Sequence, residues 1–234
     1  MKRDATRNTP LPDPKEKEHF VRSMFDDISA RYDLVNRIMT FGLDQSWRKR
    51  ALRESSLKSG ERLLDVATGT GDFLVLARTT TSNAVGLDIS LGMLKNGRSE
   101  QPLIQGSALE LPFADESIDV ITCGFALRNF TEIPRVLAEF HRVLKVHGRL
   151  AILEVSTPSN FVVKVLYNIY FNKVVPELGA LLSNASAYRY LPASVAYLPS
   201  SIELINLLTN VGFSSALQIQ LTLGVSQLLL AKKD

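Results

Sequence analysis

Between residues 62 and 155, short apolar segments alternate with helical patterns, and this alternation constrains the fold more than any other feature of the chain. Short apolar runs rich in β-branched residues are typical of buried strands, and apolar residues recurring at helical spacing are typical of helices. Alternating strand and helix units of this length imply parallel strands joined by right-handed crossovers, with helices on both faces of the sheet. The sequence therefore predicts a doubly wound α/β fold, with strands over residues 62–67, 84–88, 103–104, 118–123 and 149–155 and helices over 73–78, 90–98 and 131–145.

Further predicted elements flank this alternating region on both sides. A chain of 234 residues with 45% apolar side chains can build one substantial core, so we expect a single folded domain. Near the end, leucines alternate with polar residues around Gly224, which predicts an antiparallel hairpin at the sheet edge and brings a mostly parallel sheet to seven strands. The expected organisation is a disordered tail over residues 1–18, a helical cap over 19–58, a cofactor-binding core over 59–158, a substrate lid over 159–200, and a closing helix and hairpin over 201–234.

Charge and cysteine content limit the partners. Lys and Arg total 27 against 24 Asp and Glu, and a net charge of +3 without a basic stripe argues against a nucleic-acid partner. Cys123 is the single cysteine, so no internal disulfide forms, which fits a reducing compartment. With His19, His141 and His147 it shows no metal-ligand spacing, and no metal is expected. The N-terminal residues lack the apolar core of a signal peptide and no apolar run reads as a transmembrane helix, so we expect a cytoplasmic protein.

A glycine-rich loop follows the first predicted strand. In a doubly wound sheet, ligands bind at the carboxyl ends of the strands, where this loop belongs. Gly69 and Gly71 allow a tight turn and a close approach of a ligand to the backbone. Asp88 closes the second strand 19 residues after Gly69, where a carboxylate can accept hydrogen bonds from ribose hydroxyls. A glycine turn alone also serves strand–helix packing, but together with Asp88 it indicates a nucleoside site.

The identity of the nucleoside follows from what the loop lacks. Leu74 occupies the position where a dinucleotide-binding loop needs its third small residue, and no Gly-Lys-Ser/Thr follows as in a P-loop. Both absences favour a methyl donor, which needs carboxylates instead of a phosphate cradle. Asp65 either meets the amino-acid part of such a ligand or caps the loop, and both interpretations stay open. The turn at Ser107 and Ala108 would border the adenine, and Gly124 would lie against the methionine part.

Motifs from Met24 to Lys232 resemble those of the ubiquinone/menaquinone biosynthesis C-methyltransferases, a family that methylates prenylated quinol rings with S-adenosylmethionine. The motifs are Phe25-Asp26, Arg31-Tyr32-Asp33-Leu34-Val35-Asn36, Trp47-Arg48, Gly69-Thr70-Gly71-Asp72, Asp88-Ile89-Ser90 with Met93-Leu94, Leu111-Pro112-Phe113, Phe125-Ala126-Leu127-Arg128-Asn129, Arg142-Val143-Leu144-Lys145, Gly148-Arg149-Leu150, Leu153-Glu154-Val155-Ser156 and Tyr188-Arg189-Tyr190-Leu191. Departures from the family pattern fall at Val35, Thr40 and Asp44, where Met, Ser and His are usual, and at Ser107 and His147.

The resemblance implies a class I S-adenosylmethionine-dependent methyltransferase, with a Rossmann-like sheet. It implies attack of an electron-rich ring carbon on the methyl group, with Arg128 stabilising phenolate charge, Tyr32 and a water relaying the proton, and Asn129 facing the ring. Whether Glu154 pairs with Arg128 or packs at the strand end stays open. The expected cofactor-binding residues are Asp65, Thr68, Gly69, Thr70, Gly71, Asp88, Met93, Ser107, Ala108 and Gly124.

The stretch over residues 161–182 is rich in aromatic and aliphatic side chains, which suits either a core helix or a lid over a polyprenyl tail. A prenylated substrate resides in the bilayer, so the resemblance implies transient contact with the inner face of the membrane, aided by Lys164 and Lys173.

Demethylmenaquinol is the expected substrate, with the benzoquinol of ubiquinone synthesis as a second. Whether the chain forms a homodimer is left open. The alternatives are a small-molecule O- or N-methyltransferase and a non-catalytic protein that keeps the fold as a scaffold.

Overall fold

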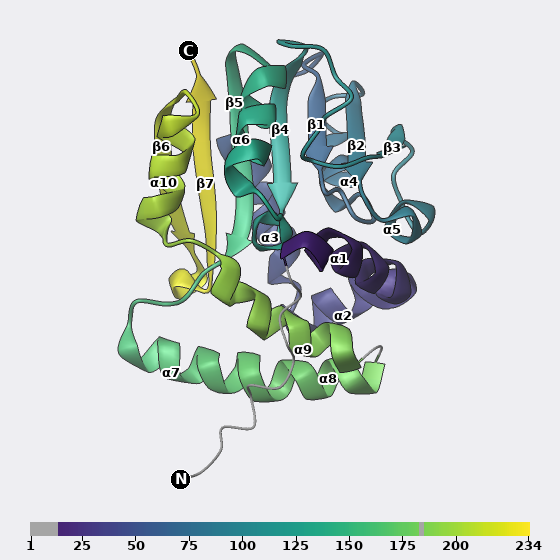
Figure 1. The fold of residues 1–234 in the computed structure, drawn as a ribbon, viewed down its shortest axis with the longest axis vertical. Helices are drawn as coiled ribbons and strands as arrows, with labels where there is room; N and C mark the ends of the chain where they lie inside the picture. Colours follow the sequence, from purple (N-terminus) through teal and green to yellow (C-terminus); the bar gives the residue numbers. More distant parts are fainter. Residues whose placement is uncertain (1–13, 183–184) are drawn as a thin grey trace.

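The computed structural model describes residues 14–182 and 185–234, and a seven-stranded sheet forms its centre (Figure 1). The strands are β1 (Leu63–Val66), β2 (Ala84–Asp88), β3 (Leu103–Gln105), β4 (Ile118–Gly124), β5 (Leu144–Val155), β6 (Phe213–Leu221) and β7 (Ser226–Lys233). The order is β3-β2-β1-β4-β5-β7-β6; strands β1 to β5 pair in parallel, whereas β7 is antiparallel to both of its neighbours. The predicted mostly parallel, doubly wound sheet with a closing hairpin is confirmed.

Helices cover both faces of the sheet and one of its ends. The α-helices are α1 (Pro14–Ile28), α2 (Tyr32–Met39), α3 (Leu43–Glu54), α4 (Asp72–Ala77), α5 (Leu91–Lys95), α6 (Ile133–Val143), α7 (Phe161–Ile169), α8 (Val175–Leu182), α9 (Ala185–Ser194) and α10 (Ser201–Asn210). A π-helical turn over Tyr170–Val174 joins α7 to α8, and short 3₁₀ turns include Leu127–Asn129 after β4.

Alternation along the strands builds two apolar layers. Leu64 and Val66 of β1 face α6 and α10, in a cluster that also contains the buried Cys123. Leu63 faces the opposite layer, where Leu74 and Ala77 of α4 pack. Because side chains of a strand point alternately to the two faces, a strand that is apolar on both sides needs helices packed against both faces of the sheet.

The structure corrects several predicted boundaries. Helix α1 begins at Pro14, so residues 14–18, assigned by the sequence to a disordered tail, form its first turn; residues 1–13 lie outside the described chain. The reason is tertiary, because Lys17 is buried and donates hydrogen bonds to the carbonyls of Arg128 and Phe130, at 3.0 and 2.9 Å. Those partners lie more than a hundred residues away and leave no local signal.

Two further elements differ from their predicted roles. Helix α3, grouped with the cap by sequence, packs Trp47 and Ala51 against β5 and β7, because these apolar residues share one helix face. The segment around Pro192, for which the sequence predicted only a place in the substrate lid, forms α9. Proline disfavours a helix interior, but burial of Tyr190, whose ring centroid lies 5.4 Å from that of Phe20, favours this one.

The strand order reverses between β1 and β4, and this switch point is where doubly wound sheets bind ligands. Figure 1 shows α1, α2 and the α7–α9 segment gathered beyond the carboxyl ends of the parallel strands. The chain therefore places its N-terminal helices and its predicted lid over the same edge of the sheet.

Among the described residues, no single helix combines the length and apolar composition needed to cross a membrane. One bent pair, Tyr190–Tyr197 with Ser201–Asn210, meets the criterion by length and composition, with an angle of 56° between its halves.

Candidate active site

The loop after β1 has an unusual backbone. Gly69 and Gly71 have φ values of 59° and 85°, and Ala67 also lies in the left-handed region, with φ 54°. A Cβ built on Gly69 would meet nothing within 4 Å, so this glycine is required by its backbone angle and leaves space beside the loop. Left-handed residues other than glycine are strained and concentrate at functional sites, which is consistent with a ligand-binding role for this loop.

Asp88 at the end of β2 ties this loop to the next turn. Its carboxylate accepts hydrogen bonds from the backbone N–H groups of Gly69 and Ser90, both at 2.8 Å. Burial raises the pKa of Asp88 to about 6, while the two amides counteract that rise. A carboxylate has about four lone-pair positions, so Asp88 keeps capacity for further donors such as hydroxyls.

Asp65 organises the loop through contacts other than those of the predicted amide cap. Its two oxygens accept hydrogen bonds from the hydroxyls of Thr68 and Thr122, at 2.6 and 2.7 Å. The side chain is 1% exposed, and burial raises its pKa to about 7. Asp65 therefore joins β4 to the glycine loop from beneath and does not border the cavity above it. Its oxygens bond to threonine hydroxyls, whereas a loop cap would bond to amides.

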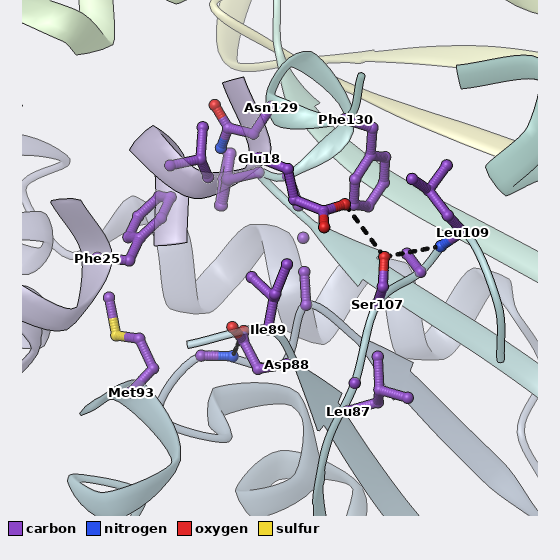
Figure 2. A pocket seen from close by; sticks show the side chains of 18 of the residues that line it. Glu18, Phe25, Leu87, Asp88, Ile89, Met93, Ser107, Leu109, Asn129 and Phe130 are labelled. Carbon is purple, nitrogen blue, oxygen red and sulfur yellow. Dashed lines mark hydrogen bonds between the residues drawn. The ribbon is translucent and has the colours of Figure 1, made fainter. Parts of the chain in front are cut away.

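Above the loop lies a cavity of about 750 Å³, bordered by the ends of β1, β2 and β4 and by α1. Figure 2 shows Asp88 and Met93 on its floor and Glu18 and Asn129 on its opposite side. The Ser107 hydroxyl donates to Glu18 of α1 at 3.2 Å and accepts from the Leu109 amide at 3.3 Å, so α1 closes over this end (Figure 2).

The structure separates the predicted cofactor-binding residues into two groups. Those that border the cavity are Gly69, Asp88, Met93, Ser107, Ala108 and Gly124. Those that shape the loop without bordering it are Asp65, Thr68, Thr70 and Gly71. Gly124 has a further reason to be glycine, because a Cβ there would lie 2.8 Å from the ring of Phe73.

The cavity suits a nucleoside. Leu87, Ile89, Leu109 and Phe130 supply apolar walls of the kind an adenine ring needs, and Asp88 presents a carboxylate of the kind that ribose hydroxyls need. The open space beside Gly69 allows contact with the backbone. S-adenosylmethionine therefore fits the chemistry of the residues present.

Polar contacts fasten the N-terminal helices to this site. Asp33 of α2 accepts a hydrogen bond from the Thr70 hydroxyl at 2.6 Å, and pairs with Arg98 at 2.9 Å. Asp26 of α1 accepts from the Ser90 hydroxyl at 2.6 Å and from the Gly92 amide at 2.7 Å. Asp26 and Asp33, which the sequence analysis named only as parts of motifs, therefore attach the N-terminal helices to the loops around the cavity.

A second cavity, of about 970 Å³, lies between α2, α3 and the α7–α8 segment. Of the described residues, only Tyr32 and Phe125 border both cavities, so these two side chains form a shared wall. Phe125 has φ 60°, a left-handed angle that is costly for a side chain with a Cβ. The remaining walls are largely aromatic and aliphatic, with Trp47, Tyr167, Tyr170, Phe171, Val175 and Leu191 among them. This cavity is therefore a candidate acceptor site for an apolar ring.

The predicted catalytic residues lie at this boundary. Arg128 borders the second cavity and forms a buried ion pair with Glu154, which settles the open question about that glutamate. The guanidinium also donates to the Phe125 carbonyl at 2.7 Å and to the Ser194 hydroxyl at 3.1 Å. Asn129 borders the first cavity, where its side-chain oxygen accepts from the Tyr190 hydroxyl at 3.3 Å.

Sequence reasoning missed a polar stripe in the second cavity. The stripe consists of residues spaced by four along α2 and α3, which all border that cavity: Tyr32, Asn36, Thr40, Asp44 and Arg48. Thr40 donates to Asp44 at 2.9 Å, and Arg48 donates to Asp44 at 3.1 Å. Two positions that depart from the family pattern, Thr40 and Asp44, are therefore bonded to each other. The spacing of four is visible in the sequence and is the signal that would have found them.

Comparisons with known proteins identify the family. The profile of the ubiE/COQ5 methyltransferase family matches residues 13–233. A ubiquinone/menaquinone biosynthesis C-methyltransferase of Geotalea uraniireducens is 40% identical over 230 residues, covering 93% of this chain and 98% of the relative. A demethylmenaquinone methyltransferase of Bacteroides fragilis is 38% identical, covering 96% of each.

Solved structures agree on the fold. A putative methyltransferase, in a complex with the Trm112 activator of Haloferax volcanii, superposes with a TM-score of 0.66 and 18% identity, over 89% of this chain and 96% of that one. A methyltransferase of Thermotoga maritima, dependent on S-adenosylmethionine, gives 0.60 and 19%, over 90% and 100%. The fold is that of class I S-adenosylmethionine-dependent methyltransferases, and the family match over nearly the whole length shows that the chain belongs to the ubiE/COQ5 methyltransferase family.

Proposed function

We propose that the chain is a C-methyltransferase that moves the methyl group of S-adenosylmethionine to a ring carbon of a prenylated quinol, principally demethylmenaquinol. The observation that carries this function is the pair of cavities with Tyr32 and Phe125 as their common wall. One cavity suits a nucleoside, and the other is large and largely apolar. Relatives named demethylmenaquinone methyltransferase, at 38 and 39% identity, support this acceptor.

The first cavity would hold the methyl donor by its polar ends. Asp88 would accept the ribose hydroxyls, and Ser107 and Met93 would border the adenine between apolar walls. When bound, S-adenosylmethionine supplies an electrophilic methyl group. Methyl transfer needs the acceptor carbon in line and about 3–3.5 Å from that methyl group. The shared wall at Tyr32 and Phe125 is where the two ligands would meet.

The second cavity would activate the ring. Arg128 borders it with a buried guanidinium that cannot lose its proton, so it would stabilise negative charge on a quinol oxygen. Burial raises the pKa of the Tyr32 hydroxyl, so this group stays protonated and donates a hydrogen bond to the same oxygen or to a water beside it. Asn129, on the donor side, would orient the reacting ring edge.

Turnover of demethylmenaquinol and of the demethylated benzoquinol by the purified protein tests this function. We expect a product heavier by one methylene, with the new methyl on a ring carbon, and faster turnover of the naphthoquinol. A methyl found on oxygen or nitrogen would favour a small-molecule methyltransferase instead. Binding of S-adenosylmethionine in a calorimeter without turnover of either quinol would contradict the proposed acceptor, and no binding would favour a scaffold protein.

The proposed substrate also requires access to a bilayer, and α7 offers a surface for it. Phe161 and Leu166 are 78% and 62% exposed, and Val162, Val165 and Ile169 extend the same apolar face. Lys164 on α7 and Lys173 beyond it are exposed as well. Apolar side chains beside cations are typical of helices that lie on anionic membranes. Because Tyr167 on α7 borders the second cavity, we place the prenyl entrance beside this helix, at the inner face of the membrane.

Vesicle flotation tests the membrane contact. We expect the protein to float with vesicles that contain anionic lipid, and the double variant Phe161→Ser/Leu166→Ser to bind about tenfold less, because two apolar side chains lose their burial in lipid. Ile202→Ser is the matched control, since Ile202 is 75% exposed on α10 and outside this face. A wild-type protein that stays unbound, or a control that weakens binding equally, would contradict the assignment.

A further inference from the structure

The proposed reaction needs a group that accepts the hydroxyl proton of the quinol, and the second cavity restricts the choice. Its titratable residues are Tyr32, Asp44, Arg48, Arg128, Tyr167 and Tyr170. Arginines stay protonated at any physiological pH and accept no proton. Burial raises the pKa of each of the tyrosines, so each remains a protonated phenol. Of the described residues that border the cavity, Asp44 is the single carboxylate.

The surroundings of Asp44 suit a carboxylate that takes up and returns a proton. The residue is 2% exposed and lies in the first turn of α3. The Thr40 hydroxyl and the Gln45 side-chain amide each donate to it at 2.9 Å, and Arg48 Nη1 donates at 3.1 Å. The Thr40 hydroxyl itself borders the cavity and also lies 2.8 Å from the Asn36 carbonyl, so its single proton has two acceptors.

A second carboxylate, that of Asp72, keeps Arg48 paired when Asp44 is protonated. Arg48 Nε lies 3.8 Å from Asp72, and the Gln45 amide donates to Asp72 at 3.0 Å as well as to Asp44. When Asp44 becomes neutral, Arg48 keeps Asp72 as its counter-charge instead of becoming an unpaired buried cation. Asp72 is in turn paired with Arg37 and Arg98.

We propose that Asp44 is the catalytic proton acceptor of the acceptor cavity, with the Thr40 hydroxyl able to relay the proton. This inference rests on the proposed quinol substrate. The quinol O–H bond breaks and its proton passes to the carboxylate, while the electron pair stays on oxygen. The ring carbon then forms its bond to the methyl group, and the C–S electron pair returns to sulfur.

The remaining protons follow from the balance of the reaction. The methylated ring carbon releases its hydrogen as a proton to water, and the electrons of that C–H bond restore the aromatic ring. Asp44 returns its own proton to the quinolate oxygen, which leaves one proton released for each methyl transferred. The cationic side chains that face this step are Arg48, on the same helix as Asp44, and Arg128. The neutral titratable ones are Tyr32, Tyr167 and Tyr170.

Asp44→Asn in the full chain, assayed with demethylmenaquinol at saturating S-adenosylmethionine, tests the assignment. We expect kcat to fall by about 10²–10⁴-fold, the range for loss of a general base, while KM for the quinol and Kd for S-adenosylmethionine change less than threefold. Asp44→Glu, which restores a carboxylate as proton acceptor, should recover most of the lost kcat.

Asp72→Asn is the matched control, because Asp72 contacts the same Arg48 and Gln45 but does not border the cavity. It should keep kcat within about tenfold of the wild type, because it takes up no proton from the quinol. An Asp44→Asn variant within threefold of the wild-type kcat, or an Asp72→Asn variant that loses as much kcat as Asp44→Asn, would overturn the proposal while leaving the quinol substrate intact. If the wild type binds S-adenosylmethionine but methylates neither quinol, the proposed function itself fails.

Discussion

Replacing Arg128 with methionine is expected to lower the free energy of unfolding by about 3–5 kcal/mol and to abolish measurable quinol methylation. The stability loss follows because Glu154 is fully buried and would lose its counter-ion. The activity loss follows because the guanidinium borders the acceptor cavity, where it would stabilise developing oxygen charge. Urea denaturation and the quinol assay measure the two effects separately.

A double variant separates these two roles. In Arg128→Met/Glu154→Gln the buried charge is gone, and the glutamine oxygen can still accept from the Val155 amide, which donates to Glu154 at 2.8 Å. We expect this protein to regain most of the lost stability but none of the turnover. Recovered turnover would show that Arg128 acts only as a structural partner of Glu154. A single variant that loses under about 1 kcal/mol would show that the ion pair contributes no more than a surface pair.

Asp88→Ala is expected to weaken S-adenosylmethionine binding by about 10²–10³-fold. Two contributions add: the ribose hydroxyls lose a charged acceptor, a bond worth about 1.5–3 kcal/mol, and the Gly69 and Ser90 amides lose the carboxylate that positions them. Titration calorimetry measures the affinity directly. Binding within threefold of the wild type would remove Asp88 from the cofactor site.

The carboxylate of Asp88 also predicts that the affinity for S-adenosylmethionine depends on pH. Burial raises the pKa of Asp88 to about 6, and its protonated form accepts fewer hydrogen bonds than its ionised form. Wild-type affinity for S-adenosylmethionine is therefore expected to be constant above pH 7 and to fall below pH 6, approaching about tenfold per pH unit. Asp88→Asn keeps an oxygen acceptor but cannot titrate, so its weaker affinity should not vary over this range. An equal pH dependence in the variant would assign the titration to another group.

Much of the fold could be predicted because its signals are local. Each strand of the parallel sheet carries its own apolar run, and each crossover helix carries its own periodicity, as in the helix around Val136 and Phe140. The start of α1, which sequence reasoning misplaced, and helix α9, which it did not predict, depend on distant partners. Helix α1 is extended by the contact of Lys17 with carbonyls near residue 130, and α9 tolerates Pro192 because Tyr190 is buried against α1.

The candidate site also combines features with local sequence signals and features that depend on distant residues. The glycine loop and Asp88 were predictable because backbone angle and chain spacing specify them. The role of Asp65 was not, because its two oxygens are occupied by Thr68 and Thr122, one of which lies on a different strand. The acceptor cavity was not predictable either, since it forms where α2 and α3 meet the α7–α8 segment, more than a hundred residues later in the chain.

The sequence by itself determined the α/β class, the glycine loop with its acidic partner, and the family, because each is encoded in residues close together in the chain. Only the tertiary structure decided which polar groups face a cavity and which serve another residue. Asp65 and Glu154 are bound to other residues and border neither cavity, whereas Asp44 and Arg128 border the acceptor cavity. A buried polar group is defined by the partner that compensates its lost hydration, and that partner is fixed by packing and not by neighbouring sequence.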